Sequence, residues 1–201
     1  ENFFDVDGID MLKLRATHGI GGNIGNSSSP YLIATYFTSY QFGGLAGLVQ
    51  SPPNADLRWE KTTTTNVGVD FALFGNRLSG SVDYYNKYSA DLLADTPLSA
   101  TQGFGYGTML VNNGEMVNRG VELALNGELI KSRDFSWNAS LLYALNKNEV
   151  KKLQSTTESA NMLISFPTTY ARIGKPLYGL YAFKWAGLNA EGDPQIYNAE
   201  G

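Results

Sequence analysis

The sequence predicts an all-β fold, an antiparallel meander of long strands that forms part of a transmembrane β-barrel. Charged residues make up only 17% of the 201 residues, whereas 22 glycines and 12% aromatic residues favour strands and turns. Polar and apolar residues alternate with period two over several long stretches, which is typical of strands with two different faces. Short connections alternate with long ones, as they do in outer-membrane barrels.

Composition and charge also exclude several classes of protein. The net charge of −4 argues against a nucleic-acid-binding protein, which would carry a basic surface. The chain has no cysteine, which excludes disulfide scaffolds, thiol nucleophiles and zinc–thiolate sites. A single histidine, His18, leaves no histidine-based triad or multi-histidine metal site, and we expect an interfacial or core side chain there.

The clearest pair of strands covers Leu57–Phe74 and Arg77–Tyr88. If Gly75-Asn76 forms a two-residue loop suited to positive φ, the register of the two strands is fixed. The predicted apolar pairs are Leu73–Leu78, Val69–Val82 and Val67–Tyr84. Every apolar residue meets its partner on the same face, as a hairpin requires.

The same alternation predicts three more strands, Met11–Ile20, Val117–Ile130 and Phe135–Leu145. The last two form a second hairpin through the polar connection Lys131–Asp134, and a further strand is expected around Leu177–Trp185. The connections at Gly75-Asn76 and Lys131–Asp134 are tight. The long connections are Asn23–Asp56, Ser89–Asn113 and Asn146–Lys175.

The two faces of these strands have different expected surroundings. The residues expected to face lipid are Val67, Val69, Phe71, Val82, Leu123, Leu125 and Leu141. Aromatic residues near strand ends, expected as anchors at the two membrane interfaces, are Trp59, Phe71, Phe74, Phe135 and Trp137. The carboxylates of the polar faces are Asp70, Asp83, Glu122 and Glu128. On barrel strands such carboxylates face a wet lumen or a plug, so we expect no acid–base catalysis from them.

Aromatic residues in the long connections are the candidates for contact with a substrate. Exposed aromatic rings stack on sugar rings or hold peptide side chains, and the alternative is that they pack the loops together. The candidates are Tyr31, Tyr36, Phe37, Tyr40, Phe42, Phe104 and Tyr106. The acidic segment 5–10 lacks the ligand set of a calcium loop, and the glycines of 103–107 lack the strand–loop–helix context of a phosphate site. No catalytic residue, metal site or cofactor is therefore expected.

Eight segments, in one order along the chain, carry a family resemblance. They are Leu12–Gly19, Asn54–Thr63, Asn66–Phe71, Asn76–Lys87, Asn113–Leu123, Asp134–Asn138, Asn146–Asn148 and Ile173–Pro176. Together they resemble the SusC/RagA-type TonB-dependent outer-membrane receptors. The resemblance implies a 22-stranded barrel around an N-terminal plug, with tight periplasmic turns and long extracellular loops. It also implies that this chain comes from the C-terminal part of the barrel.

What the resemblance implies for function is active import of oligosaccharides or peptides across the outer membrane of a Gram-negative bacterium. The implied partners are a SusD-like surface lipoprotein, TonB, outer-membrane lipid and the substrate, without nucleic acid or enzymatic activity. Residues 1–201 would be a partial barrel domain with neither plug nor TonB box. His18 departs from the pattern, since the family commonly has Tyr there.

The residues alone leave one alternative from another class, a secreted β-sandwich that binds carbohydrate or acts as an adhesin. A sandwich would bury residues such as Val67 and Leu141, whereas a barrel would expose them to lipid. Dependence of solubility on detergent separates the two.

Overall fold

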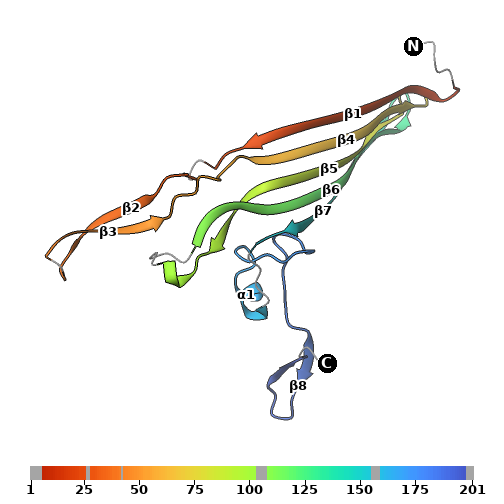
Figure 1. The fold of residues 1–201 in the computed structure, drawn as a ribbon. Coiled ribbons are helices and arrows are strands. Elements are labelled where there is room, and N and C mark those ends of the chain that lie inside the picture. The colour runs from red at the N-terminus through yellow and green to blue at the C-terminus, as the bar shows by residue number, and fades with distance from the viewer. Residues whose placement is uncertain (1–5, 26–27, 42, 103–107, 155–158, 198–201) are drawn as a thin grey trace.

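A computed structural model describes residues 6–25, 28–41, 43–102, 108–154 and 159–197. Its main sheet has the strand order β1-β4-β5-β6-β7, with every neighbouring pair antiparallel. These strands are β1 (Ile9–Asn23), β4 (Glu60–Leu73), β5 (Leu78–Pro97), β6 (Thr108–Lys131) and β7 (Ser136–Lys152). Figure 1 shows them side by side in a single curved layer, and the meander confirms the predicted fold class.

Smaller elements lie in the connections. The hairpin of β2 (Ile33–Ser39) and β3 (Gly44–Ser51) is inserted between β1 and β4 and extends away from the main sheet (Figure 1). Beyond the main sheet lie the 3₁₀ turn Ala100–Gln102, the helix α1 (Ala160–Ser165), and a hairpin of β8 (Trp185–Leu188) and β9 (Pro194–Ile196). Among the described residues, no helix is long and apolar enough to cross a membrane.

The predicted register of the first hairpin is confirmed, and the second hairpin forms between the two strands predicted for it. In the first, Leu73 pairs with Leu78, and the other pairs are Val69–Val82 and Val67–Tyr84. In the second, the apolar pairs are Val121–Leu145, Leu123–Tyr143 and Leu125–Leu141. Period-two alternation fixes the register, because a slip of one residue would move every apolar side chain to the opposite face.

The first tight turn is longer than predicted. Phe74, Gly75 and Asn76 all have positive φ, at 58°, 67° and 60°, so Phe74 leaves the strand and the paired ladder ends at Leu73–Leu78. Two bonds tie this turn to the start of β1. The Phe74 N–H donates to the Gly8 carbonyl at 2.9 Å, and the Asn76 N–H donates to Asp10 Oδ2 at 2.9 Å.

The strands predicted on either side of the long connection Ser89–Asn113 are too short, and one other predicted strand is wrong. β5 and β6 continue to Pro97 and from Thr108, so most of the predicted loop Ser89–Asn113 is paired strand. Asp91 has a positive φ of 56° and lies in a break of register between Ser89 and Leu92, which interrupts the alternation. The strand expected at Leu177–Trp185 is absent, because among these residues only Trp185 belongs to a strand.

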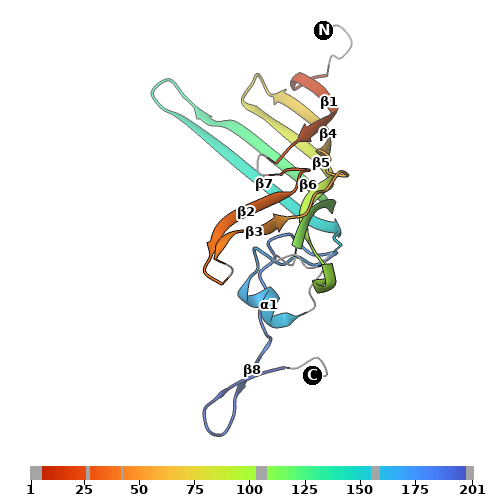
Figure 2. The ribbon, with the colours of Figure 1, turned by 60° about the vertical axis from the view of Figure 1, so that its left-hand side comes forward.

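The main sheet has no core of the kind that a sandwich would have. Within the described ranges only Ala72, Val117, Val150 and Leu163 are buried apolar residues. Val67 and Leu141, which a sandwich would bury, are 51% and 54% exposed. Figure 2 shows the sheet as one layer with both faces open, which contradicts the sandwich alternative.

The segment after β7 folds back on the outer end of that strand. The Val150 N–H donates to the Lys175 carbonyl at 3.0 Å, and the Gly174 N–H donates to the Val150 carbonyl at 2.8 Å. The Leu177 N–H donates to Asn148 Oδ1 at 2.7 Å. Two of the segments that carry the resemblance, 146–148 and 173–176, therefore meet at this end of the sheet.

Candidate functional site

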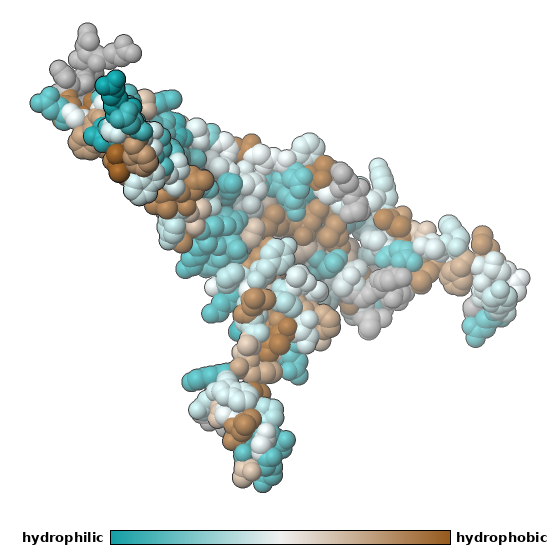
Figure 3. Space-filling model, turned by 180° about the vertical axis from the view of Figure 1, so that it is seen from behind, coloured by the Kyte–Doolittle hydropathy of each residue, from teal (hydrophilic) through white to brown (hydrophobic). Residues whose placement is uncertain are grey.

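The candidate site is the main sheet itself, with its two faces and its two ends. At one end lie the turns 74–77 and 132–135, here called the tight-turn end, and at the other the long connections, here called the loop end (Figure 1). The strand pairing places on one face the residues predicted to face lipid, Val67, Val69, Phe71, Val82, Leu123, Leu125 and Leu141. We call this the apolar face. Figure 3, seen from behind, shows hydrophobic side chains gathered near the middle of the molecule.

The opposite, polar face carries an ion-pair cluster that crosses three strands. Arg15 of β1 binds Asp70 of β4 through both of its carboxylate oxygens, at 2.7 and 2.8 Å. The same guanidinium donates from Nη2 to Asp83 Oδ2 of β5 at 2.9 Å. Bidentate pairing of this kind is the stronger form of a charge-assisted bond.

Gly68 makes this crossing possible. It lies on β4 opposite both Arg15 and Asp83, and a Cβ there would collide with Asp83 Oδ1 and lie 2.9 Å from Arg15 Nη2. The absence of a side chain lets the guanidinium reach over β4 to the next strand. Sequence reasoning assigned no role to Arg15 or Gly68, although a glycine inside a strand often marks a close approach.

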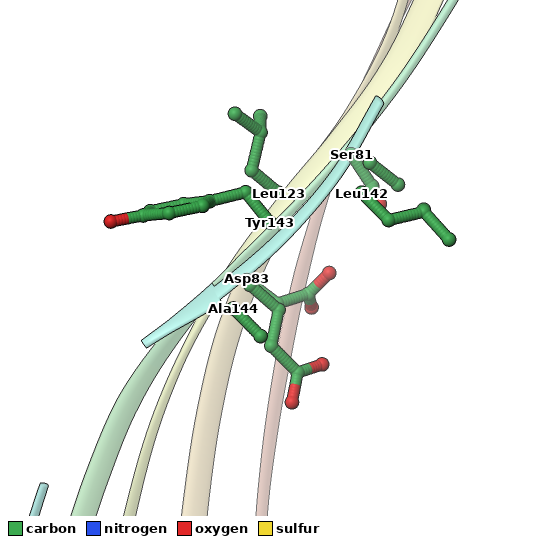
Figure 4. A pocket seen from close by; sticks show the side chains of 8 residues that line it. Ser81, Asp83, Leu123, Leu142, Tyr143 and Ala144 are labelled. Atoms are coloured by element: carbon green, nitrogen blue, oxygen red, sulfur yellow. The ribbon is translucent and has the colours of Figure 1, made fainter. Parts of the chain in front are cut away.

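A shallow hollow of about 280 Å³ lies next to this cluster. It is lined by Ser81, Asp83, Glu122, Leu123, Ala124, Leu142, Tyr143 and Ala144. Figure 4 shows Leu123 and Tyr143 pointing to one side of the sheet, and Leu142 and Asp83 to the other. Asp83 and Glu122 pair directly across β5 and β6, and Asp83 Oδ1 is buried with no hydrogen bond among the described residues.

A second polar cluster, which we call the rim clip, holds the loop end. It consists of Asn54, Arg58, Glu60, Asp91 and Asn112. Asn112 Oδ1 accepts from the Arg58 N–H at 2.8 Å, and its Nδ2 donates to the carbonyls of Arg58 and Asp91 at 2.7 and 2.6 Å. Its amide thus replaces a backbone pairing that the break of register at Asp91 has removed.

Ionic and amide contacts complete the rim clip. The Arg58 guanidinium lies 2.7 Å from Asp91 Oδ1, and this hydrogen bond lowers the pKa of Asp91. Glu60 accepts from the Leu93 N–H at 2.9 Å and from Asn23 Nδ2 at 2.8 Å. Asn54 Nδ2 donates to the Leu110 carbonyl at 2.9 Å. The segment Asn54–Thr63 therefore fastens the β2–β3 insertion to β5 and β6.

The aromatic candidates gather on the β2–β3 hairpin. Tyr36 is 69% exposed and Tyr40 fully exposed, and Tyr31 and Phe37 are exposed as well. The Tyr36 ring lies against Gly47 of the facing strand, since a Cβ at Gly47 would be 3.2 Å from Tyr36 Cε1. One ring face is thereby supported by the hairpin. Phe42, Phe104 and Tyr106 lie outside the described residues.

The remaining predicted residues lie near the ends of the apolar face. His18 is exposed rather than in a core, and its Nδ1 lies 2.9 Å from Thr65 Oγ1. Trp59 packs on Gly22 at the loop end, and Phe74, Phe135 and Trp137 are exposed at the tight-turn end. Within the described ranges no three His, Asp or Glu side chains are grouped so that they could hold a metal ion.

Comparison with known proteins agrees with this geometry. A family model for the TonB-dependent receptor-like β-barrel matches residues 10–199. TonB-dependent receptor P39 of Formosa agariphila is 33% identical over 207 residues, which cover 100% of this chain and 19% of that protein. TonB-dependent receptor SusC of Bacteroides thetaiotaomicron is 35% identical over 167 residues, covering 79% and 17%. The chain thus spans about a fifth of the length of these relatives.

Solved structures show the same fold. The RagAB peptide importer in its closed-closed state matches 98% of this chain and 23% of that one, with a TM-score of 0.75 and 25% identity. Its open-open state matches 99% and 23%, with a TM-score of 0.75 and 26% identity. These comparisons confirm the resemblance to the SusC/RagA type. The chain belongs to the TonB-dependent receptor-like β-barrel family.

Proposed function

We propose that this chain forms part of the barrel of an outer-membrane receptor that imports oligosaccharides or peptides with energy from TonB. The observation that carries the proposal is the two-faced sheet, with a continuous apolar face on one side and the Arg15–Asp70–Asp83 cluster on the other. Such a sheet fits between lipid and a polar lumen. Its chemistry is that of a transport conduit.

The two edge strands of the main sheet favour the interpretation that the sheet is part of a larger barrel. β1 and β7 each have a neighbour on one side only within the described sheet. Unpaired backbone groups are costly in lipid, so both strands must pair with further strands when the sheet lies in a membrane. We propose that residues 1–201 are one sector of a 22-stranded barrel whose plug and TonB box belong to other parts of the receptor.

The two ends of the sheet suggest an orientation. Short turns mark the periplasmic side of outer-membrane barrels, and long loops mark the outside. The turns at 74–77 and 132–135 would then be periplasmic, and the β2–β3 hairpin extracellular. Thiol labelling of intact cells should modify a Ser28→Cys receptor and spare Ser132→Cys, and the reverse pattern would contradict the orientation.

The extracellular partners belong to the same proposal. A SusD-like lipoprotein would cover the loop end, and the exposed rings of Tyr31, Tyr36, Phe37 and Tyr40 would contact the substrate. Among the solved relatives, RagAB is described as a peptide importer. For the present chain the substrate is proposed only as an oligosaccharide or a peptide.

The test is uptake by cells that produce the complete receptor. Uptake of labelled oligosaccharides and peptides should require the receptor, its SusD-like lipoprotein and TonB. Uptake by cells without TonB equal to that of the parent strain would overturn the proposal. A receptor with Tyr36→Ala and Tyr40→Ala should take up substrate more slowly, whereas Tyr178→Ala, at another exposed tyrosine, should not.

A further inference from the structure

A row of polar and basic residues crosses all five strands where the apolar face ends. Strand pairing places five residues in this row, one on each strand: His18, Thr65, Asn86, Arg119 and Lys147. We call it the polar row. All five lie on the apolar face, because they alternate with the polar-face residues of their own strands.

Residue types change abruptly between the polar row and the neighbouring row on the same face. The next row toward the tight-turn end consists of Ala16, Val67, Tyr84, Val121 and Leu145. A spanning strand needs about 9–11 residues, and the stretch of β4 from Leu73 to Thr65 has about that length. The polar row therefore lies at the boundary of the apolar face on the side of the loop end.

Arg119 and Lys147 lie directly opposite each other in this row. Like charges in facing positions destabilise a sheet, and both side chains are exposed. The Arg119 Nε donates to Asn86 Oδ1 at 3.0 Å, and no carboxylate pairs with either cation among the described residues. Glu149, one row further out on the same face, is bound to Lys151 at 2.6 Å.

Of the basic residues at the tight-turn end, Lys131 forms an ion pair. The Lys131 ammonium lies 3.0 Å from Glu128, and an Arg77 Nη2 lies 3.5 Å from the Glu128 carbonyl. Two exposed cations thus face each other in register across β6 and β7, and the Glu149 carboxylate, one row further out, interacts with both of them only beyond ion-pair distance. An anion on this face would relieve the repulsion between Arg119 and Lys147.

We propose that Arg119 and Lys147 bind the phosphate group of a lipid in the outer leaflet. This inference rests on the proposed function, which puts the apolar face in lipid and the loop end outside. The planar guanidinium suits two phosphate oxygens, and the ammonium adds a mobile point charge beside it. The apolar rows below Arg119 and Lys147 would accept the acyl chains of the same lipid.

The experiment uses the complete receptor in nanodiscs of a phosphate-free glycolipid that contain equal amounts of lipid A and its dephosphorylated form. Native mass spectrometry measures the ratio of retained phosphorylated to dephosphorylated lipid. The wild-type receptor should favour the phosphorylated form. Arg119→Gln with Lys147→Gln should reduce the ratio roughly tenfold, which corresponds to about 1.4 kcal/mol, because the variant loses both charge-assisted contacts to the phosphate. Inorganic phosphate added in solution should not displace the lipid.

Two matched variants complete the test. Lys131→Gln with Arg133→Gln, at the tight-turn end, should keep the wild-type ratio, and so should the charge-preserving pair Arg119→Lys with Lys147→Arg. A wild-type receptor that retains both lipids equally, or displacement by inorganic phosphate, would overturn the lipid site alone. A wild-type receptor that does not insert into nanodiscs would overturn the proposed function as well.

Discussion

The hairpins β4–β5 and β2–β3 are both antiparallel pairs, yet they are stabilised in different ways. β4–β5 separates its residues into an apolar face and a polar face, and Asp70 and Asp83 share the cation of β1. β2–β3 belongs to a stretch, residues 23–55, that contains no charged residue. Exposed tyrosines, with Phe37 and Leu45, are its most prominent side chains.

The two hairpins also differ in how they are attached: neighbouring strands hold β4–β5, whereas β2–β3 is attached to the molecule at its base. Each strand of β4–β5 is paired on both sides, whereas β2 and β3 pair only with each other in the described sheet. An isolated two-stranded hairpin is marginally stable in water. The β2–β3 hairpin therefore depends on the rim clip and on the Asn54 N–H, which donates to the Pro30 carbonyl at 2.9 Å.

The largest expected effect is a charge placed on the apolar face. Leu123 lies in the middle rows of this face, paired with Val82 and Tyr143. Leu123→Arg in the complete receptor should cost about 2–4 kcal/mol of folding free energy in liposomes, because the charge enters the hydrocarbon. Asn126→Arg, on the polar face of the same strand, is the control and should cost far less. Equal costs would show that the two faces do not separate lipid from lumen.

The second effect tests the crossing of β4 by Arg15. Gly68→Ala puts a methyl group where Asp83 Oδ1 and Arg15 Nη2 now lie, so the ion pair must shift. We expect the free energy of unfolding, measured with urea in liposomes, to fall by about 1–3 kcal/mol, as it does at other overpacked sites. Gly21→Ala, where a Cβ would meet no atom within 4 Å, is the matched control and should be close to neutral. A neutral Gly68→Ala receptor would contradict the role of this glycine.

These two regions also show what the sequence can predict. The faces of β4–β5 and β6–β7 follow from alternation, because a strand with one apolar and one polar face repeats its residue types with period two. The rim clip leaves no such repeat, since Asn112 acts through three bonds to backbone groups of residues distant in sequence. Alternation also does not predict that β5 continues past Tyr88. The left-handed residue Asp91 breaks the register there, and the alternation of residue types is interrupted. Arg15 could be assigned to the polar face from its position, but its partners required the register.

The third effect concerns the attachment of the hairpin. Asn112→Ala removes the amide that bonds Arg58 and Asp91, and each such bond contributes about 0.5–1.5 kcal/mol net. We expect a local loss of about 1–2 kcal/mol, seen as faster hydrogen exchange in residues 54–60 with little change in the main sheet. Asn138→Ala, at an exposed position of β7, is the control. Unchanged exchange in 54–60 would show that the rim clip does not hold this segment.

The smallest effect is a dependence of the rim clip on pH. The hydrogen bond from Arg58 lowers the pKa of Asp91 below its ordinary value of 3.8. A group with a lowered folded pKa stabilises the structure above its unfolded pKa, and this contribution disappears as the pH falls through the folded value. Hydrogen exchange in residues 54–60 should therefore be slow at neutral pH and, corrected for intrinsic rates, become faster below about pH 4. Asp91→Asn should make the corrected rate independent of pH in this range.

The effect is small because the Arg58 side chain is largely exposed, and water screens the pair. A corrected rate that rises equally in Asp91→Asn would contradict the role of Asp91 in this acid sensitivity.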